Sequence, residues 1–408
     1  MWKSSIRQSA IITAILLIAL VAATSGQPRR AMTPADILRV ANVSDAQISP
    51  DGKWVVYTVS TVTGNESTST LWVARVGVDF AAPTITPLPS GPQRGRPVIL
   101  SDRAGGRDAP APLLPSGWNA SNPRWSPDGS KIVFLGSHEE QSGIWVLNFE
   151  TREPRFVVTP QNTNFFITYA GESLAWAPDS KRIAYISATE EPTVRDPIIA
   201  EAPADDPRVI DRIQYKSRTS FSDNRRTHVW ITAIDRPEPR QLTSGAFYDH
   251  AVTFSPDGNE IAFISNREPD PDANNNSDIF AVDLHGEVRQ ITATKGCEYE
   301  PAWSPDGKWI AYTATKRDVT TIDSVAEDTH LWVISAAGGG GRELTGEQDR
   351  RARSPRWSSD NHWILFLAGD RGETLIFRVG ADGGPVHRFL LFPSPKGKPD
   401  DNSAQPTL

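Results

Sequence analysis

One pattern of apolar and polar positions occurs six times along the chain. In each copy an apolar residue, usually aromatic, precedes the tetrapeptide S-P-D-G or a close variant, and an alternating run such as I-A-F or I-A-Y follows it. Proline, aspartate and glycine in that order suit a tight turn, and alternation at period two is typical of a half-buried strand. Each copy therefore predicts a β-hairpin. The copies begin at Ile48, Trp125, Trp176, Phe254, Trp303 and Trp357.

Further strands follow each predicted hairpin. A third apolar segment occurs in every copy, and a fourth occurs in the more regular ones, as at 289–292 and 342–345. Four short antiparallel strands about every 50 residues describe one blade of a propeller. The sequence therefore predicts an all-β fold, a β-propeller of six recognisable four-stranded blades. It leaves open whether the ring is six-bladed, or seven-bladed and incomplete.

The aromatic residue before each turn is expected to fill the space between neighbouring blades, since a large flat ring buries much apolar area there. We interpret these rings as core residues without a ligand role. Trp118 lies outside the repeat frame, and its truncation is expected to cost far less stability than truncation of a repeat aromatic. The predicted repeat core consists of Trp125, Trp176, Phe254, Trp303 and Trp357.

The first 25 residues have the pattern of a signal peptide. Lys3 and Arg7 precede an uncharged apolar run from Ile11 to Ala23, and small residues follow that run. We expect residues 1–25 to be removed and the protein to be secreted or periplasmic, without other membrane association. An uncleaved anchor is the alternative.

The rest of the chain divides into three predicted parts. Residues 26–43 form an N-terminal segment with a short helix, because Thr33-Pro34-Ala35-Asp36 has the order of an N-cap, a first-turn proline and an acid. The propeller is expected over 44–392. The polar tail 393–408 is expected to be disordered.

Composition excludes some classes of partner. The formal net charge is −7 and no long basic run occurs, which argues against a nucleic-acid partner. Cys297 is the single cysteine, so an intrachain disulfide cannot form. We interpret it as a packed or surface thiol.

An enlarged loop in the third repeat is the candidate binding surface. The insertion at 188–226 is acidic in its first part and both basic and aromatic in its second part. A long loop on a rigid scaffold often carries function, and a peptide carboxylate or a partner domain would suit its basic side chains. The alternative is a solvated extension that pairs its own charges. The candidate contact residues are Arg212, Tyr215, Lys216, Arg218, Arg225 and Arg226.

A second loop offers the one candidate metal site. Oxygen-bearing side chains alternate along it, as they do in many calcium loops, but the glycine and distal glutamate of a helix-loop-helix site are missing. The alternative is a plain polar hairpin loop. No cofactor is expected, with calcium as the possible exception. Its candidate ligands are Asp270, Asp272, Asn274, Asn276 and Asp278. The seven histidines show no spacing typical of a local metal pair.

Beyond the repeats, three stretches carry a resemblance to a known family. They are M-T-P-A-D-I-L-R-V-A from Met32, R-V-I-D-R-I-Q-Y-K-S-R from Arg208, and S-N-R-E-P-D-P-D-A-N-N-N-S-D-I-F from Ser265. With the TolB-like W-S-P-D-G repeats, the chain resembles the N-terminal half of secreted serine peptidases of the prolyl oligopeptidase family, in the acylaminoacyl-peptidase and dipeptidyl-peptidase branch. In that family the propeller covers an α/β-hydrolase domain and admits short peptides to its active site.

The chain contains no G-x-S-x-G nucleophile motif, so no catalytic residue is assigned. The resemblance implies a non-catalytic propeller that gates or binds peptides for a hydrolase domain not present in this chain. Its expected partners are a peptide or protein, including a separately encoded α/β-hydrolase domain. A stand-alone periplasmic TolB-like propeller acting as a protein-binding scaffold is the alternative, and an enzyme with a site at the propeller axis is a third reading.

Overall fold

The structure is a computed structural model. It describes residues 40–76, 110–164, 171–190, 221–271, 276–316 and 328–389, together with Thr33, Asp36, Ile210, Tyr215 and Asn274. The predicted signal peptide at 1–25, the predicted tail at 393–408 and most of the segment at 26–43 lie outside the described residues. Where the short helix was expected, the carboxylate of Asp36 accepts hydrogen bonds from the backbone N and Oγ1 of Thr33.

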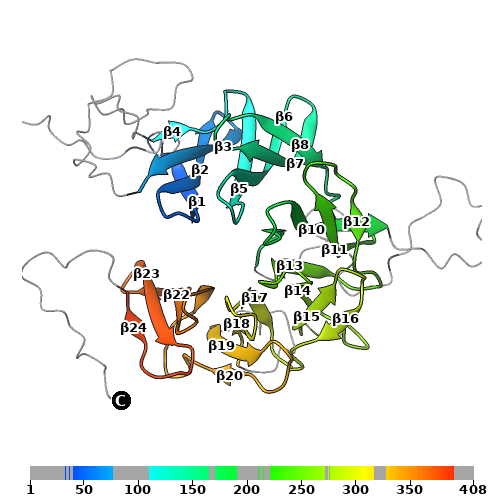
Figure 1. The fold of residues 1–408 in the computed structure, drawn as a ribbon, viewed down its shortest axis with the longest axis vertical. Helices are drawn as coiled ribbons and strands as arrows, with labels where there is room; N and C mark the ends of the chain where they lie inside the picture. Colours follow the sequence, from blue (N-terminus) through cyan, green and yellow to red (C-terminus); the bar gives the residue numbers. More distant parts are fainter. Residues whose placement is uncertain are drawn as a thin grey trace, which may run out of the picture. The chain divides into compact units, whose positions relative to one another are not determined.

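The described strands form six antiparallel four-stranded sheets (Figure 1). Blade 1 consists of β1 (Asn42–Ile48), β2 (Trp54–Thr63), β3 (Glu66–Arg75) and β4 (Ala111–Pro112). Blade 2 consists of β5 (Trp118–Trp125), β6 (Lys131–His138), β7 (Gln141–Asn148) and β8 (Pro154–Val158). Blade 3 consists of β9 (Leu174–Trp176), β10 (Arg182–Glu190), β11 (Arg225–Ala233) and β12 (Arg240–Gln241).

The last three blades repeat the same order of strands. Blade 4 consists of β13 (Asp249–Phe254), β14 (Glu260–Ser265), β15 (Asp278–Asp283) and β16 (Val288–Gln290). Blade 5 consists of β17 (Glu298–Trp303), β18 (Trp309–Ala314), β19 (His330–Ser335) and β20 (Arg342–Glu343). Blade 6 consists of β21 (Arg353–Trp357), β22 (Trp363–Asp370), β23 (Glu373–Gly380) and β24 (His387–Arg388). The predicted class, an all-β propeller of six four-stranded blades, is confirmed.

The chain forms two compact units, residues 1–121 and 122–408. The first holds blade 1 and the start of β5, and the second holds the rest of blade 2 and blades 3 to 6. Within the second unit, β13, β17 and β21, the first strands of blades 4, 5 and 6, lie side by side. No helix among the described residues is long and apolar enough to cross a membrane.

The S-P-D-G turn is stabilised by its own side chains. In blade 4, Ser255 Oγ donates to Asp257 Oδ1 at 2.6 Å and accepts from the backbone N of Glu260 at 3.0 Å. Asp257 Oδ1 also accepts from the backbone N of Asn259 at 3.1 Å. Gly258 has a φ of +72°, a conformation that glycine adopts without strain. The repeated sequence therefore fixes the hairpin between the first two strands of a blade.

The first strand of each blade except blade 3 contains a residue with positive φ, three positions before the turn aromatic. These residues are Asp45, Asn122, Ala251, Glu300 and Ser354, with φ between 51° and 58°. In β13, β17 and β21 the pairing register shifts at this position, which marks a β-bulge. The positive-φ position is therefore a recurring feature of the blade backbone, although the residue type there differs between blades.

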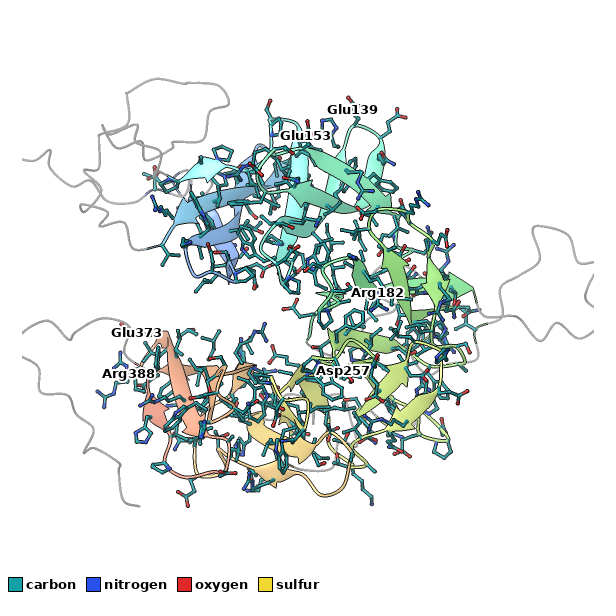
Figure 2. The ribbon with its side chains drawn as sticks, in the orientation of Figure 1. Glu139, Glu153, Arg182, Asp257, Glu373 and Arg388 are labelled. Carbon is teal, nitrogen blue, oxygen red and sulfur yellow. The ribbon has the colours of Figure 1, made fainter. Side chains whose placement is uncertain are left out.

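Apolar side chains from neighbouring blades pack together to form the core of the second unit. Figure 2 draws the described side chains on the ribbon. Trp176 and Phe254 are buried, while Trp125, Trp303 and Trp357 are half-buried. Two of the indoles also tie blades together, because Trp176 Nε1 donates to Arg124 O at 2.9 Å and Trp357 Nε1 donates to Ala302 O at 3.0 Å.

The placement of Trp118 outside the repeat frame is wrong. Trp118 begins β5 and is buried in the first unit. The repeat motif marks only the end of a first strand, so the start of that strand carried no signal in the sequence.

Candidate functional site

The insertion in blade 3 connects β10 and β11, as the repeat pattern predicted. The two strands pair in register out to Glu190 and Arg225, so the insertion runs from 191 to 224, a few residues shorter at each end than the sequence indicated. Of these residues the structure describes Ile210, Tyr215 and 221–224.

The end of the insertion is held by a reciprocal pair of side chains, Asn164 and Asp223. The backbone N of Asn164 donates to Asp223 Oδ2 at 2.9 Å, and the backbone N of Asp223 donates to Asn164 Oδ1 at 3.0 Å. Thr163 Oγ1 and the backbone N of Arg225 also donate to Asp223 Oδ1. Burial raises the pKa of Asp223, but the backbone hydrogen bonds from Asn164 and Arg225 hold it below its usual value overall. An ionised carboxylate therefore anchors the insertion to the connection between β8 and β9.

Two aromatic side chains of the insertion are exposed beside this anchor. Tyr215 is 55% exposed and Phe221 is 60% exposed. Their ring centroids lie 6.3 Å apart, and the backbone N of Ser222 donates to Tyr215 O at 2.9 Å. Exposed aromatic rings held by a fixed backbone are typical of sites that contact a peptide or protein. We call Tyr215 and Phe221 the aromatic pair.

The basic residues predicted for this surface have different positions. Arg212, Lys216 and Arg218 lie outside the described residues. Arg225 and Arg226 belong to β11 and not to the loop. Arg226 is only 8% exposed, and its Nη1 donates to the hydroxyl of Tyr248 at 2.8 Å.

The guanidinium of Arg226 also lies 4.8 Å from the centre of the Tyr248 ring. Because Tyr248 directly precedes β13, this contact joins blade 3 to the start of blade 4. Arg226 is therefore a buried strand residue that links two blades, and not an exposed loop residue. The sequence did not reveal this role because it did not show at which residue the strand after the insertion begins.

A buried ion network lies at the same ends of the blade 3 and blade 4 strands. Asp249 is fully buried, its Oδ2 lies 3.3 Å from His228 Nδ1, and its Oδ1 accepts from Arg267 Nη2 at 3.0 Å. The Arg267 guanidinium packs over Phe263 and Phe280. Burial raises the pKa of Asp249, while His228 and Arg267 outweigh that effect and hold the pKa below its usual value. This paired network gives the region a rigid base.

The loop from Ser265 to Asp278 was the candidate calcium site. Asp272 lies outside the described residues. Asn274 Oδ1 accepts from the backbone N of Asn276 at 2.9 Å, and Asp278 Oδ1 accepts from Thr292 Oγ1 and the backbone N of Thr294, both at 3.0 Å. In the described part of the chain, no three His, Cys, Asp or Glu side chains are placed to hold a metal. Calcium binding here stays a prediction.

A pair of buried carboxyl groups joins blades 4 and 5 near this loop. Glu298 is 1% exposed, and Thr294 connects it to Asp278, since Thr294 Oγ1 donates to Glu298 Oε1 at 2.7 Å. Burial raises the pKa of Asp278, and burial together with the charge of Asp278 raises the pKa of Glu298 well above its usual value. Cys297 is fully buried, and burial raises its thiol pKa to about 11, so it is not a nucleophile at neutral pH.

One charged cluster at the first strands was not predicted from the sequence; its two arginines lie on β5 and β21, and its glutamate lies two residues before β9. Arg124 Nε donates to Glu172 Oε2 at 2.9 Å, and Arg356 Nη2 donates to Glu172 Oε1 at 3.4 Å. The three residues come from blades 2, 3 and 6 of the same unit. The signal that could have found them is the tripeptide P-R-W, which ends at both Trp125 and Trp357. A partner 184 residues away along the chain could not be assigned from it.

The comparisons with known proteins agree with the fold. No protein-family profile matches the chain. It is 23% identical to dipeptidyl-peptidase 5 of Porphyromonas gingivalis over 88% of this chain and 49% of that protein. It is 22% identical to the uncharacterized peptidase YuxL of Bacillus subtilis over 75% of this chain and 34% of that protein.

Among solved structures, the acylaminoacyl peptidase of Pyrococcus horikoshii superposes with a TM-score of 0.57 at 16% identity, over 86% of this chain and 46% of that chain. The predicted resemblance to peptidase propellers is confirmed. The likeness covers the propeller half of these peptidases, and the chain spans a third to a half of the curated relatives' length.

Proposed function

We propose that this propeller is the non-catalytic part of a peptidase of the prolyl oligopeptidase type, and that it guides short peptides to an α/β-hydrolase domain. The observation that carries the proposal is the likeness to dipeptidyl-peptidase 5 across 88% of this chain but only 49% of that protein. The absence of a G-x-S-x-G motif from the sequence agrees with it. The propeller supplies binding and selection, and the hydrolase domain supplies the nucleophile.

The proposed contact surface is the aromatic pair, next to the Asn164–Asp223 anchor. Tyr215 and Phe221 offer exposed rings. The Asn164–Asp223 pair holds the backbone directly after Phe221, and the contact of Arg226 with Tyr248 holds the start of β11 against the residue before β13. A preorganised surface loses little conformational entropy when it binds, which favours recognition of a flexible peptide or of a partner domain. The proposal also takes residues 1–25 as an export signal, so that the propeller acts in a secreted or periplasmic location.

The test combines the purified chain with the separately produced hydrolase domain of Porphyromonas gingivalis dipeptidyl-peptidase 5. We expect no hydrolysis of chromogenic dipeptide substrates by the chain alone. We also expect calorimetrically detectable binding of the hydrolase domain or of unlabelled short peptides. Binding of neither, or hydrolysis by the chain alone that a serine-directed inhibitor abolishes, would contradict the proposal.

Variants locate the surface. The double substitution Tyr215→Ala with Phe221→Ala is expected to weaken this binding at least fivefold without lowering Tm, because both rings are exposed. Trp309→Ala is the matched control, since Trp309 is also an exposed aromatic residue but lies on β18 of blade 5. Equal loss of binding in both variants would show that the insertion is not the contact surface. The alternative, a TolB-like scaffold, predicts that the chain binds folded proteins and does not bind the hydrolase domain.

A further inference from the structure

In two blades, the residue at the fourth position of the turn links the blade to the one before it. Where this position is not glycine, its side chain forms a hydrogen bond across the junction. Ser180 Oγ of blade 3 accepts from the backbone N of Asp128 in blade 2 at 3.1 Å. Asn361 Oδ1 of blade 6 accepts from the backbone N of Asp306 in blade 5 at 3.0 Å. The junction between blades 4 and 5 has Gly307 at this position and therefore has no such bond.

The same junction lacks the second connection found elsewhere. Trp176 and Trp357 each donate an indole hydrogen bond to the preceding blade. Trp303 Nε1 has no hydrogen-bond partner among the residues described. From blade 2 onward, three junctions have a turn tryptophan: those between blades 2 and 3, blades 4 and 5, and blades 5 and 6. Of these three, and among the described residues, only the junction between blades 4 and 5 lacks both the indole hydrogen bond and the hydrogen bond from the fourth turn position.

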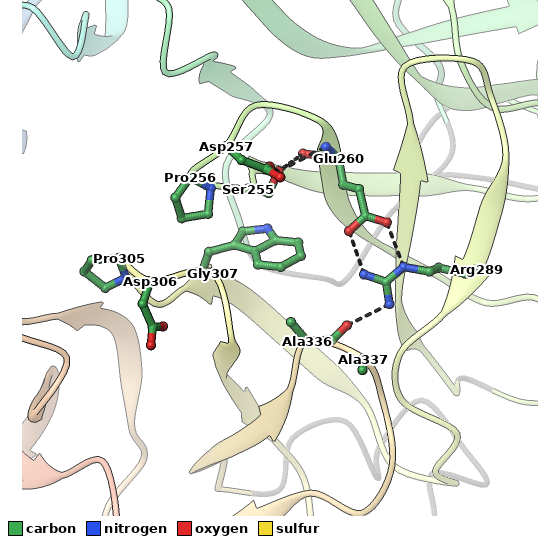
Figure 3. Close-up of a pocket in the computed structure, with 11 residues that line it drawn as sticks. Ser255, Pro256, Asp257, Glu260, Arg289, Pro305, Asp306, Gly307, Ala336 and Ala337 are labelled. Atoms are coloured by element: carbon green, nitrogen blue, oxygen red, sulfur yellow. Dashed lines mark hydrogen bonds and ion pairs between the residues drawn. The ribbon is translucent and has the colours of Figure 1, made fainter.

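A pocket of about 730 Å³ opens at this junction (Figure 3). Its apolar wall comes from Trp303, Pro256 and Pro305, and from the turn that contains Ala336. The pocket lies at the turn between first and second strands. The blade 3 insertion leaves from the opposite end of a second strand, so the two surfaces are separate.

The charged side chains that line the pocket include more carboxylates than cations. Arg289 is neutralised, because its Nε and Nη2 donate to the two carboxylate oxygens of Glu260 at 2.7 Å each. A hydrogen bond from Ser255 holds the pKa of Asp257 below its usual value, so this carboxylate is ionised at neutral pH. No cationic side chain pairs with Asp257 in the part of the chain that the structure describes.

Asp306 adds a second carboxylate to the same pocket. A hydrogen bond from Ser304 holds its pKa below the usual value. Among the described residues, its cationic contact is with Lys308 Nζ at 3.4 Å, on a side chain that is 76% exposed. An exposed pair of this kind contributes little energy and is readily displaced. The pocket therefore combines an aromatic wall with an excess of negative charge.

We propose that this pocket binds the side chain of an arginine in a peptide. A guanidinium fits both features, since it stacks on an indole and pairs with carboxylates. The flanking prolines and Ala336 would contact the methylene stem of the same side chain. The site is distinct from the aromatic pair of the insertion. The propeller can therefore select a peptide for an arginine in its sequence, independently of any contact with a hydrolase domain.

The test uses the peptide acetyl-Ala-Arg-Ala-amide and the same peptide with citrulline in place of arginine. Citrulline keeps the shape of the side chain and removes its charge. We expect quenching or enhancement of tryptophan fluorescence to report binding of the arginine peptide, with at least tenfold weaker binding of the citrulline peptide. Equal affinity of the two peptides, or binding of neither at millimolar concentration, would overturn the proposal.

Gly307→Asn provides the decisive variant. Gly307 has a φ of +71°, close to the +63° that Asn361 adopts in the next blade, and an added Cβ would lie at an ordinary 3.7 Å from Pro256. The new side chain is expected to bond across the junction as Asn361 does and to fill the pocket. We expect at least tenfold loss of peptide affinity with an unchanged or higher Tm, a combination that misfolding cannot produce.

Gly52→Asn is the matched control, because Gly52 occupies the same turn position in blade 1 with a φ of +70° and has nothing within 4 Å of an added Cβ. It should leave binding unchanged. Full binding by Gly307→Asn, with the thermal stability of the unmodified chain, would show that the peptide binds elsewhere.

Discussion

Replacing Glu298 with glutamine should remove a specific part of the pH dependence of stability. The pKa of Glu298 is raised well above its ordinary 4.5 by burial and by the charge of Asp278. The folded state therefore holds a proton that the unfolded state releases as the pH rises above about 4.5. Stability is fully present below that pH and is lost as the pH rises toward the folded pKa.

The size of the effect follows from proton linkage. While one extra proton is bound in the folded state, the free energy of unfolding falls by about 1.4 kcal/mol per pH unit. Glutamine keeps the acceptor for Thr294 Oγ1 but cannot ionise. The stability of Glu298→Gln should therefore depend less on pH than that of the unmodified chain, by about 1.4 kcal/mol per pH unit above pH 5 for as long as the folded carboxyl group stays protonated. Asp278, whose pKa is also raised, leaves a residual slope of the same sign.

Urea denaturation followed by tryptophan fluorescence, at several pH values from 5 to 8, measures this slope. Glu150→Gln is the control, because the Glu150 side chain is exposed and its removal should leave the slope unchanged. If Glu298→Gln retains the full pH dependence of the unmodified chain, Glu298 ionises normally in the folded state. The account of a buried, protonated carboxyl group would then be wrong.

Three further predictions concern the scaffold. Trp176→Ala should lower stability by about 3–5 kcal/mol, measured by urea denaturation, because it truncates a buried ring; a loss below about 1 kcal/mol would contradict its place in the core. Gly171→Ala should lower Tm in calorimetry, since the added Cβ would lie 2.2 Å from that of Ala251, whereas Gly369→Ala, with nothing within 4 Å, should not. Deleting residues 192–220 should leave Tm nearly unchanged and abolish the binding assigned to the insertion; a collapsed thermal transition would show instead that the segment is structural.

The repeat predicted the blades because each turn is encoded locally. Ser255, Asp257 and Gly258 satisfy one another within a few residues, so their order alone predicts the hairpin. The limits of the prediction follow from the same fact. Trp118 begins a strand whose recognisable motif comes seven residues later, and nothing near Trp118 in the sequence marks it as buried.

The site residues were harder to predict because their roles depend on partners far along the chain. Arg225 and Arg226 looked like loop residues until the pairing of β10 with β11 placed them in a strand. Glu172 gave no signal, since its two arginine partners are 48 and 184 residues away. The pocket beside Trp303 depends on hydrogen bonds that are present at two junctions and missing at a third, a difference that only the comparison of blades in space reveals.

In the bulge of the first strands, the backbone conformation is the same from blade to blade while the side chain varies. Five blades hold the same left-handed residue at the same position, yet its side chain is a carboxylate in Asp45 and Glu300, an amide in Asn122, a methyl group in Ala251 and a hydroxyl in Ser354. A β-branched residue would be strained there, but the backbone accepts side chains that are not β-branched, from the methyl group of Ala251 to the longer carboxylate of Glu300. The first strands can therefore change their side-chain chemistry while each blade keeps its backbone shape, and one propeller scaffold can in this way serve unrelated ligands.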